Sequence, residues 1–272
     1  MNGADKSDDW LGRNERVWDE RVRHSRAHTR TVRREDLENP MPHIDPLGWL
    51  GGCVAGQSVL CLASGGGLQS ILFAKAGADV TVLDISSAML KQDIEVAREL
   101  GLRIRTVHRS MDDLQIFPDR HFDLVVQPVS TCYVPDLVKV YRGVARIVKP
   151  GGLYIVQHKQ PGSLQGSAQP LHNGQYYVVE NPYYRSGPLP PVQGNFEHRE
   201  SGAQEFLHRW EVMIGGLCRE GFVIEDLMEP RHADSSAPSG TFRHRSQFLA
   251  PYVLIKARRC QTVEPDRPLI IT

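Results

Sequence analysis

A turn of three glycines and a single carboxylate farther along the chain are the residues whose type and spacing most clearly predict chemistry. The glycines occupy 65–67, directly after the apolar run 58–62, and Asp84 ends the next apolar run. Glycine lets the backbone approach a ligand closely, and a helix that begins after such a turn offers free N–H groups. A carboxylate at the end of the second strand can accept both hydroxyl protons of a ribose. The pair predicts a site for a ligand that contains a nucleoside.

The glycine spacing separates two kinds of nucleoside ligand. A dinucleotide loop requires a further glycine three residues after its second glycine, and this chain has Ser70 there. Small residues alternate instead at Ala63, Gly65 and Gly67, which is the spacing of loops that bind S-adenosylmethionine. We therefore expect an adenosylmethionine site and not the nicotinamide site of an oxidoreductase.

Apolar runs alternate with helical periodicity around this loop. We expect buried strands at 58–62, 79–83, 104–108, 122–127 and 153–158. Helices are expected from the glycine turn to about 76, over 86–100 and over 136–148. In the second of these helices the periodicity places Met89, Leu90, Ile94 and Ala97 inward. Strands that alternate with helices predict a parallel sheet with right-handed crossovers.

The flanking segments predict a cap, a lid and the closing elements of the sheet. One or two helices are expected over 9–34, with Trp10, Val17, Trp18 and Val22 as an apolar stripe. Segment 160–200 is rich in Gly, Pro, Tyr, His and Asn, and loops of this length are usually functional. A helix over 202–219 and strands at 222–229 and 248–257 should follow. The predicted organisation is a cap (1–50), a core (51–159), a lid (160–200), closing elements (201–258) and a tail (259–272).

Four motifs in this order resemble the class I S-adenosylmethionine-dependent methyltransferases, in the group with the type 11 methyltransferase domain. They are Leu-Ala-Ser-Gly-Gly-Gly (62–67), Val-Thr-Val-Leu-Asp-Ile-Ser (80–86), Phe-Asp-Leu-Val-Val (122–126) and Arg-Ile-Val-Lys-Pro-Gly-Gly (146–152). The stretch 127–136 resembles a bacterial branch of that group. The resemblance implies a Rossmann-like, mostly parallel sheet of seven strands whose last strand is antiparallel. It also implies a cofactor at the strand ends and an acceptor beneath a variable cap.

The same resemblance assigns the cofactor site residue by residue. Ala63, Ser64, Gly65 and Gly67 would line the methionine and the ribose, and Asp84 would hold the ribose. The remaining members are Ile85 packed on the adenine, Met111 and Asp112 at its edge, and Gln127 at the start of the loop under the methionine. Three positions depart from the family pattern. Cys61 stands where many members have an acid, Ala63 replaces a glycine, and Ser110 replaces an adenine-side Asp.

The acceptor side is less defined, because methyl transfer needs a general base only when the acceptor has a proton to lose. Histidine is a natural base because it can be neutral at physiological pH. We expect His158, at the end of the fifth strand, as the catalytic base, with Tyr133 orienting the acceptor. In the lid, His172, Tyr177 and His198 are further candidates for binding the acceptor. Cys132 is interpreted as a small buried thiol and not as a nucleophile.

Composition narrows the partners and the location. Lys and Arg total 32 and balance 32 Asp and Glu, so no overall field attracts nucleic acid. The five cysteines form no C-x-x-C pair, which argues against a metal site or a disulfide framework. Neither a signal peptide nor a run long enough to cross a membrane is visible. We expect a cytoplasmic protein with no membrane partner.

Three functions remain open from the residues alone. The leading interpretation is S-adenosylmethionine-dependent O- or N-methylation of a small molecule. An RNA-directed methyltransferase is supported only by eight arginines between Arg13 and Arg34. The departures at Cys61, Ala63 and Ser110 keep a non-catalytic S-adenosylmethionine-binding protein as the third possibility.

Overall fold

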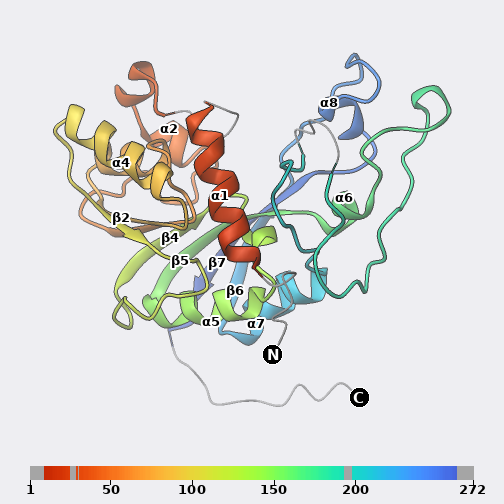
Figure 1. The fold of residues 1–272 in the computed structure, drawn as a ribbon. Coiled ribbons are helices and arrows are strands. Elements are labelled where there is room, and N and C mark those ends of the chain that lie inside the picture. Colours follow the sequence, from red (N-terminus) through yellow and green to blue (C-terminus); the bar gives the residue numbers. More distant parts are fainter. Residues whose placement is uncertain (1–8, 25–28, 30, 193–197, 262–272) are drawn as a thin grey trace, which may run out of the picture.

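One seven-stranded sheet organises the computed structural model, which describes residues 9–24, 29, 31–192 and 198–261 (Figure 1). The strands are β1 Ser58–Leu62, β2 Asp79–Asp84, β3 Ile104–His108, β4 Phe122–Gln127, β5 Val148–Lys159, β6 Phe222–Met228 and β7 Tyr252–Arg259. Their spatial order is β3-β2-β1-β4-β5-β7-β6, and β7 runs antiparallel to both of its neighbours while the other pairs are parallel. The structure thus confirms the predicted sheet with its antiparallel last strand. Such sheets bind ligands at the point where the strand order reverses, here between β1 and β4.

Burial on both faces explains why the central strands are continuous apolar runs. Along β1, Leu60 and Leu62 join a core that includes Tyr141 of α5 (Leu137–Ile147). The intervening residues Val59 and Cys61 join the opposite core, which includes Phe73 of α3 (Gln69–Lys75). Adjacent side chains of a strand point to opposite faces, so each strand serves both cores. The sheet therefore holds its strand ends rigidly.

The longer helices begin where the sequence supplies a side-chain cap. Ser86 accepts a hydrogen bond from the N–H of Met89 at the start of α4 (Ser87–Glu99), and Asp136 accepts one from Lys139 at the start of α5. Such caps satisfy N–H groups that have no partner inside the helix. The other helices are α1 Trp10–Arg23, α2 Met41–Ile44, α6 Pro161–Gln165, α7 Gly216–Arg219 and α8 Phe242–Arg245. No described helix is long and apolar enough to cross a membrane.

Four details of the sequence-based prediction were wrong. The helix expected over 202–219 begins only at the π-helical turn Glu211–Gly215, because 203–209 run irregularly beside β5 and place Glu205 in contact with Lys159. The last strand begins at Tyr252 and not at 248, after α8 and its following turn. In α4, Ile94 is exposed and Asp93 is buried. In α1, the buried residue is Asn14, while the predicted apolar stripe is only partly covered.

Helix α1 packs against α4 and connects distant segments of the chain (Figure 1). The Asn14 amide donates to the carbonyls of Tyr133 at 3.2 Å and Gln204 at 3.1 Å, and its oxygen accepts the N–H of Gln204 at 2.7 Å. One turn later, Asp19 accepts from the Ser86 hydroxyl at 2.6 Å and from the Ala88 N–H at 3.1 Å. The amphipathic helix is therefore fixed by polar groups as well as by packing. Part of the predicted cap, at 1–8, 25–28 and 30, lies outside the described residues.

Replacing Asn14 with alanine should destabilise the protein, because three buried backbone groups lose their partner together. We expect a loss of roughly 1–3 kcal/mol in the free energy of unfolding. Urea unfolding followed by circular dichroism measures it. Arg16→Ala on the same helix, where the side chain is exposed, is the control and should change stability by less than about 0.5 kcal/mol. Equal effects of the two substitutions would contradict the role given to Asn14.

Candidate active site

A cavity of about 530 Å³ opens at the carboxyl ends of β1, β2 and β4. On the β2 side its walls include Ala63, Ser64, Gly65, Asp84, Ile85 and Met111. On the β5 and β7 side they include Trp18, Tyr133, Gln157, Glu200, His232 and Tyr252. Strands β1 and β4 separate β2 from β5, and neighbouring strands lie about 4.8 Å apart. The cavity is thus long enough to have two distinct ends, and its volume is typical of a small-molecule site.

Asp84 and Gly65 form the polar corner at the first end. The Asp84 carboxylate accepts the N–H of Gly65 at 2.9 Å through one oxygen and the N–H of Ser86 at 2.8 Å through the other. Burial raises the pKa of this carboxyl, and the two N–H groups oppose that rise. A Cβ at position 65 would lie 2.8 Å from the Cβ of Met89, so only glycine permits this contact. The corner is therefore fixed before any ligand binds.

The walls around this corner suit an adenosyl group. Ile85, Met89 and Met111 present apolar surface to the cavity beside the Asp84 carboxylate. Ala63 takes a φ of +48°, in the left-handed region where glycine is normally used. The Ser64 hydroxyl donates to Gln69 at 2.7 Å. An apolar wall next to a buried carboxylate suits an adenine joined to a ribose.

The far side of the glycine loop is occupied by the protein itself. The buried carboxylate of Asp93 accepts the N–H of Gly66 at 2.8 Å, the N–H of Gly67 at 3.0 Å and the Ser70 hydroxyl. These are the donors that a dinucleotide loop offers to a diphosphate. A carboxylate already bound to them excludes a second anion, which supports the interpretation drawn from Ser70.

Three predicted cofactor residues do not line the cavity. Gly67 lies on the side of the loop that faces away from the cavity, where a Cβ would meet Val96 and Thr31. Asp112 forms an ion pair with Lys139 at 2.8 Å. Gln127 is buried beneath the site, where its amide donates to Ser130 at 2.9 Å and accepts from the Tyr154 hydroxyl.

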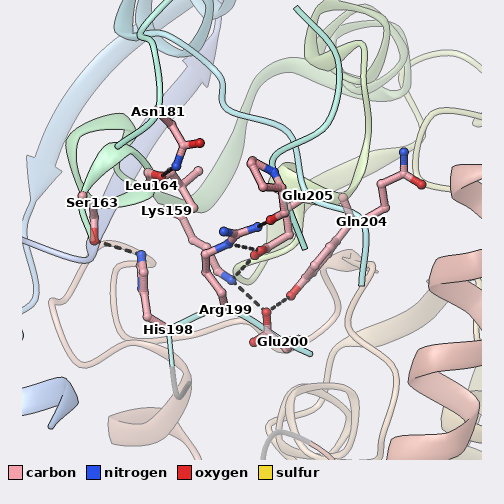
Figure 2. Close-up of polar contacts among 12 residues, drawn as sticks. Lys159, Ser163, Leu164, Asn181, His198, Arg199, Glu200, Gln204 and Glu205 are labelled. Atoms are coloured by element: carbon pink, nitrogen blue, oxygen red, sulfur yellow. Dashed lines mark hydrogen bonds and ion pairs between the residues drawn. The ribbon is translucent and has the colours of Figure 1, made fainter. Parts of the chain in front are cut away.

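Tyr133 lines the second end of the cavity and contacts a buried cluster of charges, of which Figure 2 shows Lys159, Arg199, Glu200 and Glu205. Its hydroxyl donates to Glu200 at 2.5 Å. Lys159 contacts Glu200 at 2.8 Å and Glu205 at 2.6 Å, and Arg199 contacts Glu205 at 2.5 Å. Burial and the nearby carboxylates raise the pKa of Tyr133 well above its usual value, so the phenol remains protonated. Its one proton is donated to Glu200, so toward a ligand the oxygen can accept a hydrogen bond. The phenol supplies no phenolate base near neutral pH.

The predicted base His158 is buried away from the cavity. Its Nδ1 lies 2.7 Å from the Thr131 hydroxyl and its Nε2 lies 3.2 Å from the Tyr141 hydroxyl. Because side chains alternate along β5, Gln157 faces the cavity and His158 faces the opposite core. Burial lowers the pKa of His158 to about 3. Both ring nitrogens are thus engaged by the protein.

The lid residues named from the sequence are also outside the cavity walls. His172 stacks edge-on against Tyr176, and the Tyr177 hydroxyl contacts His244 at 2.9 Å. His198 is buried, with its Nε2 2.9 Å from the Ser163 hydroxyl (Figure 2). Cys132 is buried as expected, and burial raises its pKa. Of the acceptor-side candidates, only Tyr133 reaches the cavity.

His232 is the cavity residue that sequence reasoning missed. It follows β6, and its ring packs edge-on against Phe242 and Tyr252, each at 5.3 Å between ring centroids. No residue of the described ranges hydrogen-bonds its ring nitrogens, and burial followed by the charge of Arg243 lowers its pKa. It lies in a loop outside every motif, so no signal in the sequence marked it. Trp18 and Tyr252 were also missed because they were interpreted as ordinary packing residues.

A Rossmann-like sheet with a glycine loop, a ribose-type carboxylate and a two-ended cavity defines a class I S-adenosylmethionine-dependent methyltransferase. The family model described as "Methyltransferase domain" matches residues 60–156. The chain is 34% identical to "Uncharacterized methyltransferase YbaJ" of Bacillus subtilis (strain 168) over 235 residues, covering 81% of this chain and 91% of that protein. It therefore belongs to the class I S-adenosylmethionine-dependent methyltransferase family.

Two further similarities are shorter or more distant. The "Ubiquinone biosynthesis O-methyltransferase" of Bordetella avium (strain 197N) is 34% identical over 118 residues, which cover 42% of this chain and 49% of that protein. A crystal structure of an S-adenosylmethionine-dependent methyltransferase from Mesorhizobium loti superimposes with a TM-score of 0.61 at 23% identity, covering 76% of this chain and 92% of that one. The latter similarity supports the fold alone.

Replacing Lys159 with methionine should destabilise the protein strongly, because Glu200 and Glu205 would remain buried without their shared cation. Removal of one member of a buried ion pair costs about 3–5 kcal/mol. Lys91→Met is the matched control, since Lys91 forms only an exposed pair with Glu95, and it should cost less than about 1 kcal/mol. Chemical unfolding of both variants measures the difference, and a loss below 1 kcal/mol for Lys159→Met would contradict the assignment.

Proposed function

We propose that this methyltransferase takes its methyl group from S-adenosylmethionine and transfers it to an oxygen or nitrogen of a small molecule. The observation that carries the proposal is the single cavity that joins the Gly65–Asp84 corner to a second end rich in aromatic side chains. Such an arrangement can hold two ligands in contact. Holding two reactants in line contributes a large part of the rate enhancement in group transfer.

The cofactor end would be held by the residues already in contact with one another. Asp84 would accept the ribose hydroxyls, and Ile85 and Met111 would pack on the adenine. Ala63, Ser64 and Gly65 would border the methionine portion. When bound, S-adenosylmethionine supplies an electrophilic methyl group on a sulfonium. Gly67, Asp112 and Gln127 would act on the cofactor only through the residues they position.

The acceptor end favours a planar aromatic or heterocyclic compound with polar substituents. Trp18, Tyr133 and Tyr252 supply aromatic faces, and Gln157 supplies an amide at the wall. Tyr133 would orient the acceptor through its aromatic face and through its hydroxyl oxygen, which can accept a hydrogen bond while its proton is donated to Glu200. Trp18 comes from α1, so this helix would close the cavity over the acceptor and exclude water.

We propose His232 as the residue that takes up the acceptor's proton. It lines the cavity, its lowered pKa leaves it neutral near pH 7, and its ring nitrogens are not engaged by described residues. His158 is also neutral near pH 7, but it does not line the cavity and both of its ring nitrogens are engaged, so we replace the assignment made from the sequence. The short similarity to an O-methyltransferase agrees with an acceptor that carries a hydroxyl group.

An RNA acceptor is less well supported than a small molecule. Arg13 donates to the carbonyl of Gly202 at 2.7 Å, and Arg33 pairs with Glu35 and Asp36. These arginines are used within the protein. Arg26 and Arg30 lie outside the described residues. A non-catalytic S-adenosylmethionine-binding protein would differ from the proposed enzyme only in showing no turnover.

Calorimetric titration with S-adenosylmethionine, S-adenosylhomocysteine and NADH tests the cofactor. We expect micromolar binding of both adenosyl ligands and none of NADH. Asp84→Ala should weaken binding at least about tenfold, because a hydrogen bond to a charged group contributes roughly 1.5–3 kcal/mol. Asp79→Ala, at the exposed start of the same strand, should leave the affinity unchanged. Absence of adenosyl-ligand binding to the wild-type protein would refute the proposed function.

A screen of hydroxylated and amino-substituted aromatic compounds, with S-adenosylhomocysteine formation as the readout, tests turnover. Parallel reactions with RNA, at low and high salt, test the alternative acceptor, since nucleic-acid binding weakens steeply with salt. Cofactor binding without turnover on any compound would favour the non-catalytic alternative.

His232 should titrate below its ordinary pKa of 6.5, with the neutral form present above that midpoint. Ring resonances followed by NMR between pH 4 and 8 measure this, and His232→Asn identifies the signal. His244→Asn is the control, because that ring contacts Tyr177 and does not line the cavity. With any acceptor found by the screen, kcat/KM should fall as pH drops through this midpoint. A midpoint above 6.5, or a wild-type rate in His232→Asn, would exclude the role.

A further inference from the structure

The burial of Asp93 is the feature of α4 that the helical pattern did not predict. Periodicity placed Ile94 inward, yet Ile94 is 51% exposed and Asp93 is 0% exposed. Burying a carboxylate is costly unless several donors surround it. The orientation of α4 therefore buries a carboxylate in place of an apolar side chain. Hydrogen bonds to that carboxylate must compensate for the cost of its burial.

The bonds that compensate for the burial of Asp93 come from the glycine loop and from Ser70 in the first turn of α3. One Asp93 oxygen accepts the Gly66 N–H at 2.8 Å, and the other accepts the Gly67 N–H at 3.0 Å and the Ser70 hydroxyl. No described cation forms an ion pair with it. All of its partners belong to the loop or to the first turn of α3.

The titratable groups that face Asp93 are Asp84 from β2 and Cys61 from β1. Neither carries positive charge, so they do not stabilise the carboxylate. Burial raises the pKa of Asp93 to about 6, and the bonds from Ser70, Gly66 and Gly67 oppose that rise. The ionised form thus depends on the loop, just as the loop depends on it.

We propose that Asp93 is a positioning residue that holds the glycine loop in the conformation that binds the adenosyl ligand. The inference rests on the proposed use of S-adenosylmethionine. Asp93 binds the N–H groups of Gly66 and Gly67 on the side of the loop that faces α4, while Asp84 binds the Gly65 N–H on the side that faces the cavity. The surface of Ala63, Ser64 and Gly65 is thereby presented to the cavity.

Asp93 also accounts for the departure at Cys61. Where the family resemblance would place an acid on the first strand, this chain has a thiol whose pKa is raised by burial and by the charge of Asp93. The carboxylate near the loop comes from α4 instead. We call the bonds from Asp93 to Gly66, Gly67 and Ser70 the clamp. Without the clamp, the ligand would have to order the loop when it binds, which would lower its affinity.

The test is the dissociation constant of S-adenosylhomocysteine, measured by calorimetry at pH 7.5. Asp93→Asn keeps the shape of the side chain but replaces an acceptor with a donor, and it should weaken binding by about tenfold or more, as expected for lost bonds to a charged group. Glu95→Gln removes an exposed carboxylate from the same helix and should leave the constant within twofold. Circular dichroism verifies that each variant is folded.

The pH dependence distinguishes a clamp from a general packing role. Protonation of Asp93 turns an acceptor into a donor that faces N–H groups, so the wild-type advantage over Asp93→Asn should shrink as pH falls from 7.5 to 5.5. The ratio of the two dissociation constants cancels ionisation of the ligand. Ser70→Ala removes a bond that lowers the pKa of Asp93, so it should move this transition to higher pH. Alanine suits a helix, so this variant is expected to fold.

Each outcome bears on a separate statement. A weakened Asp93→Asn with the pH-dependent ratio, or a shifted transition in Ser70→Ala alone, supports the clamp. Equal constants for the wild type and Asp93→Asn across the pH range overturn it. If Asp93→Asn does not fold, the pH dependence of the dissociation constant is compared between Ser70→Ala and the wild type, and identical profiles overturn it. If the wild type binds no S-adenosylhomocysteine, the proposed function itself fails.

Discussion

The backbone N–H groups of the glycine loop must find acceptors, and the rest of the site depends on how they do so. Gly65 donates forward to Asp84 at the end of β2, while Gly66 and Gly67 donate backward to Asp93 of α4. The loop is thus stretched between two buried carboxylates with no cation bonded to either among the described residues. Buried polar groups are tolerated only when they are paired, so the two contacts fix both the loop and the angle of α4.

At the other end of the cavity, buried carboxylates are instead paired with cationic side chains. Lys159, Arg199, Glu200 and Glu205 are brought together from β5 and from the segment before the π-helical turn, and their charges balance (Figure 2). Such clusters contribute more to defining a unique arrangement than to net stability. Glu200 accepts a hydrogen bond from the Tyr133 hydroxyl at the cavity wall, and Asn14 of α1 bonds the carbonyls of Tyr133 and Gln204. This end of the cavity is consequently assembled from parts of the chain that are far apart in sequence.

This difference explains which site residues could be predicted. Ala63, Ser64, Gly65, Asp84 and Ile85 follow directly from strand ends, because a parallel sheet places all carboxyl ends at one edge. His158 also ends a strand, but one residue of alternation turns it into the opposite core, where Thr131 and Tyr141 engage both nitrogens. Strand boundaries predicted from sequence are uncertain by at least one residue, so they cannot decide which face of the sheet His158 occupies. His232 and Tyr252 meet only because β7 inserts between β5 and β6.

The sequence by itself determined the alternation of strands and helices along the chain and the residues of the Gly65–Asp84 corner, because these depend on local periodicity and on glycine at defined positions. It also indicated that a diphosphate would not bind, through Ser70. The tertiary structure alone decided which face of α4 is buried, since a paired carboxylate at Asp93 outweighed the apolar preference of Ile94. It also decided which histidine lies in the cavity, because that depends on strand order and on long-range polar contacts that leave no periodic trace in the chain.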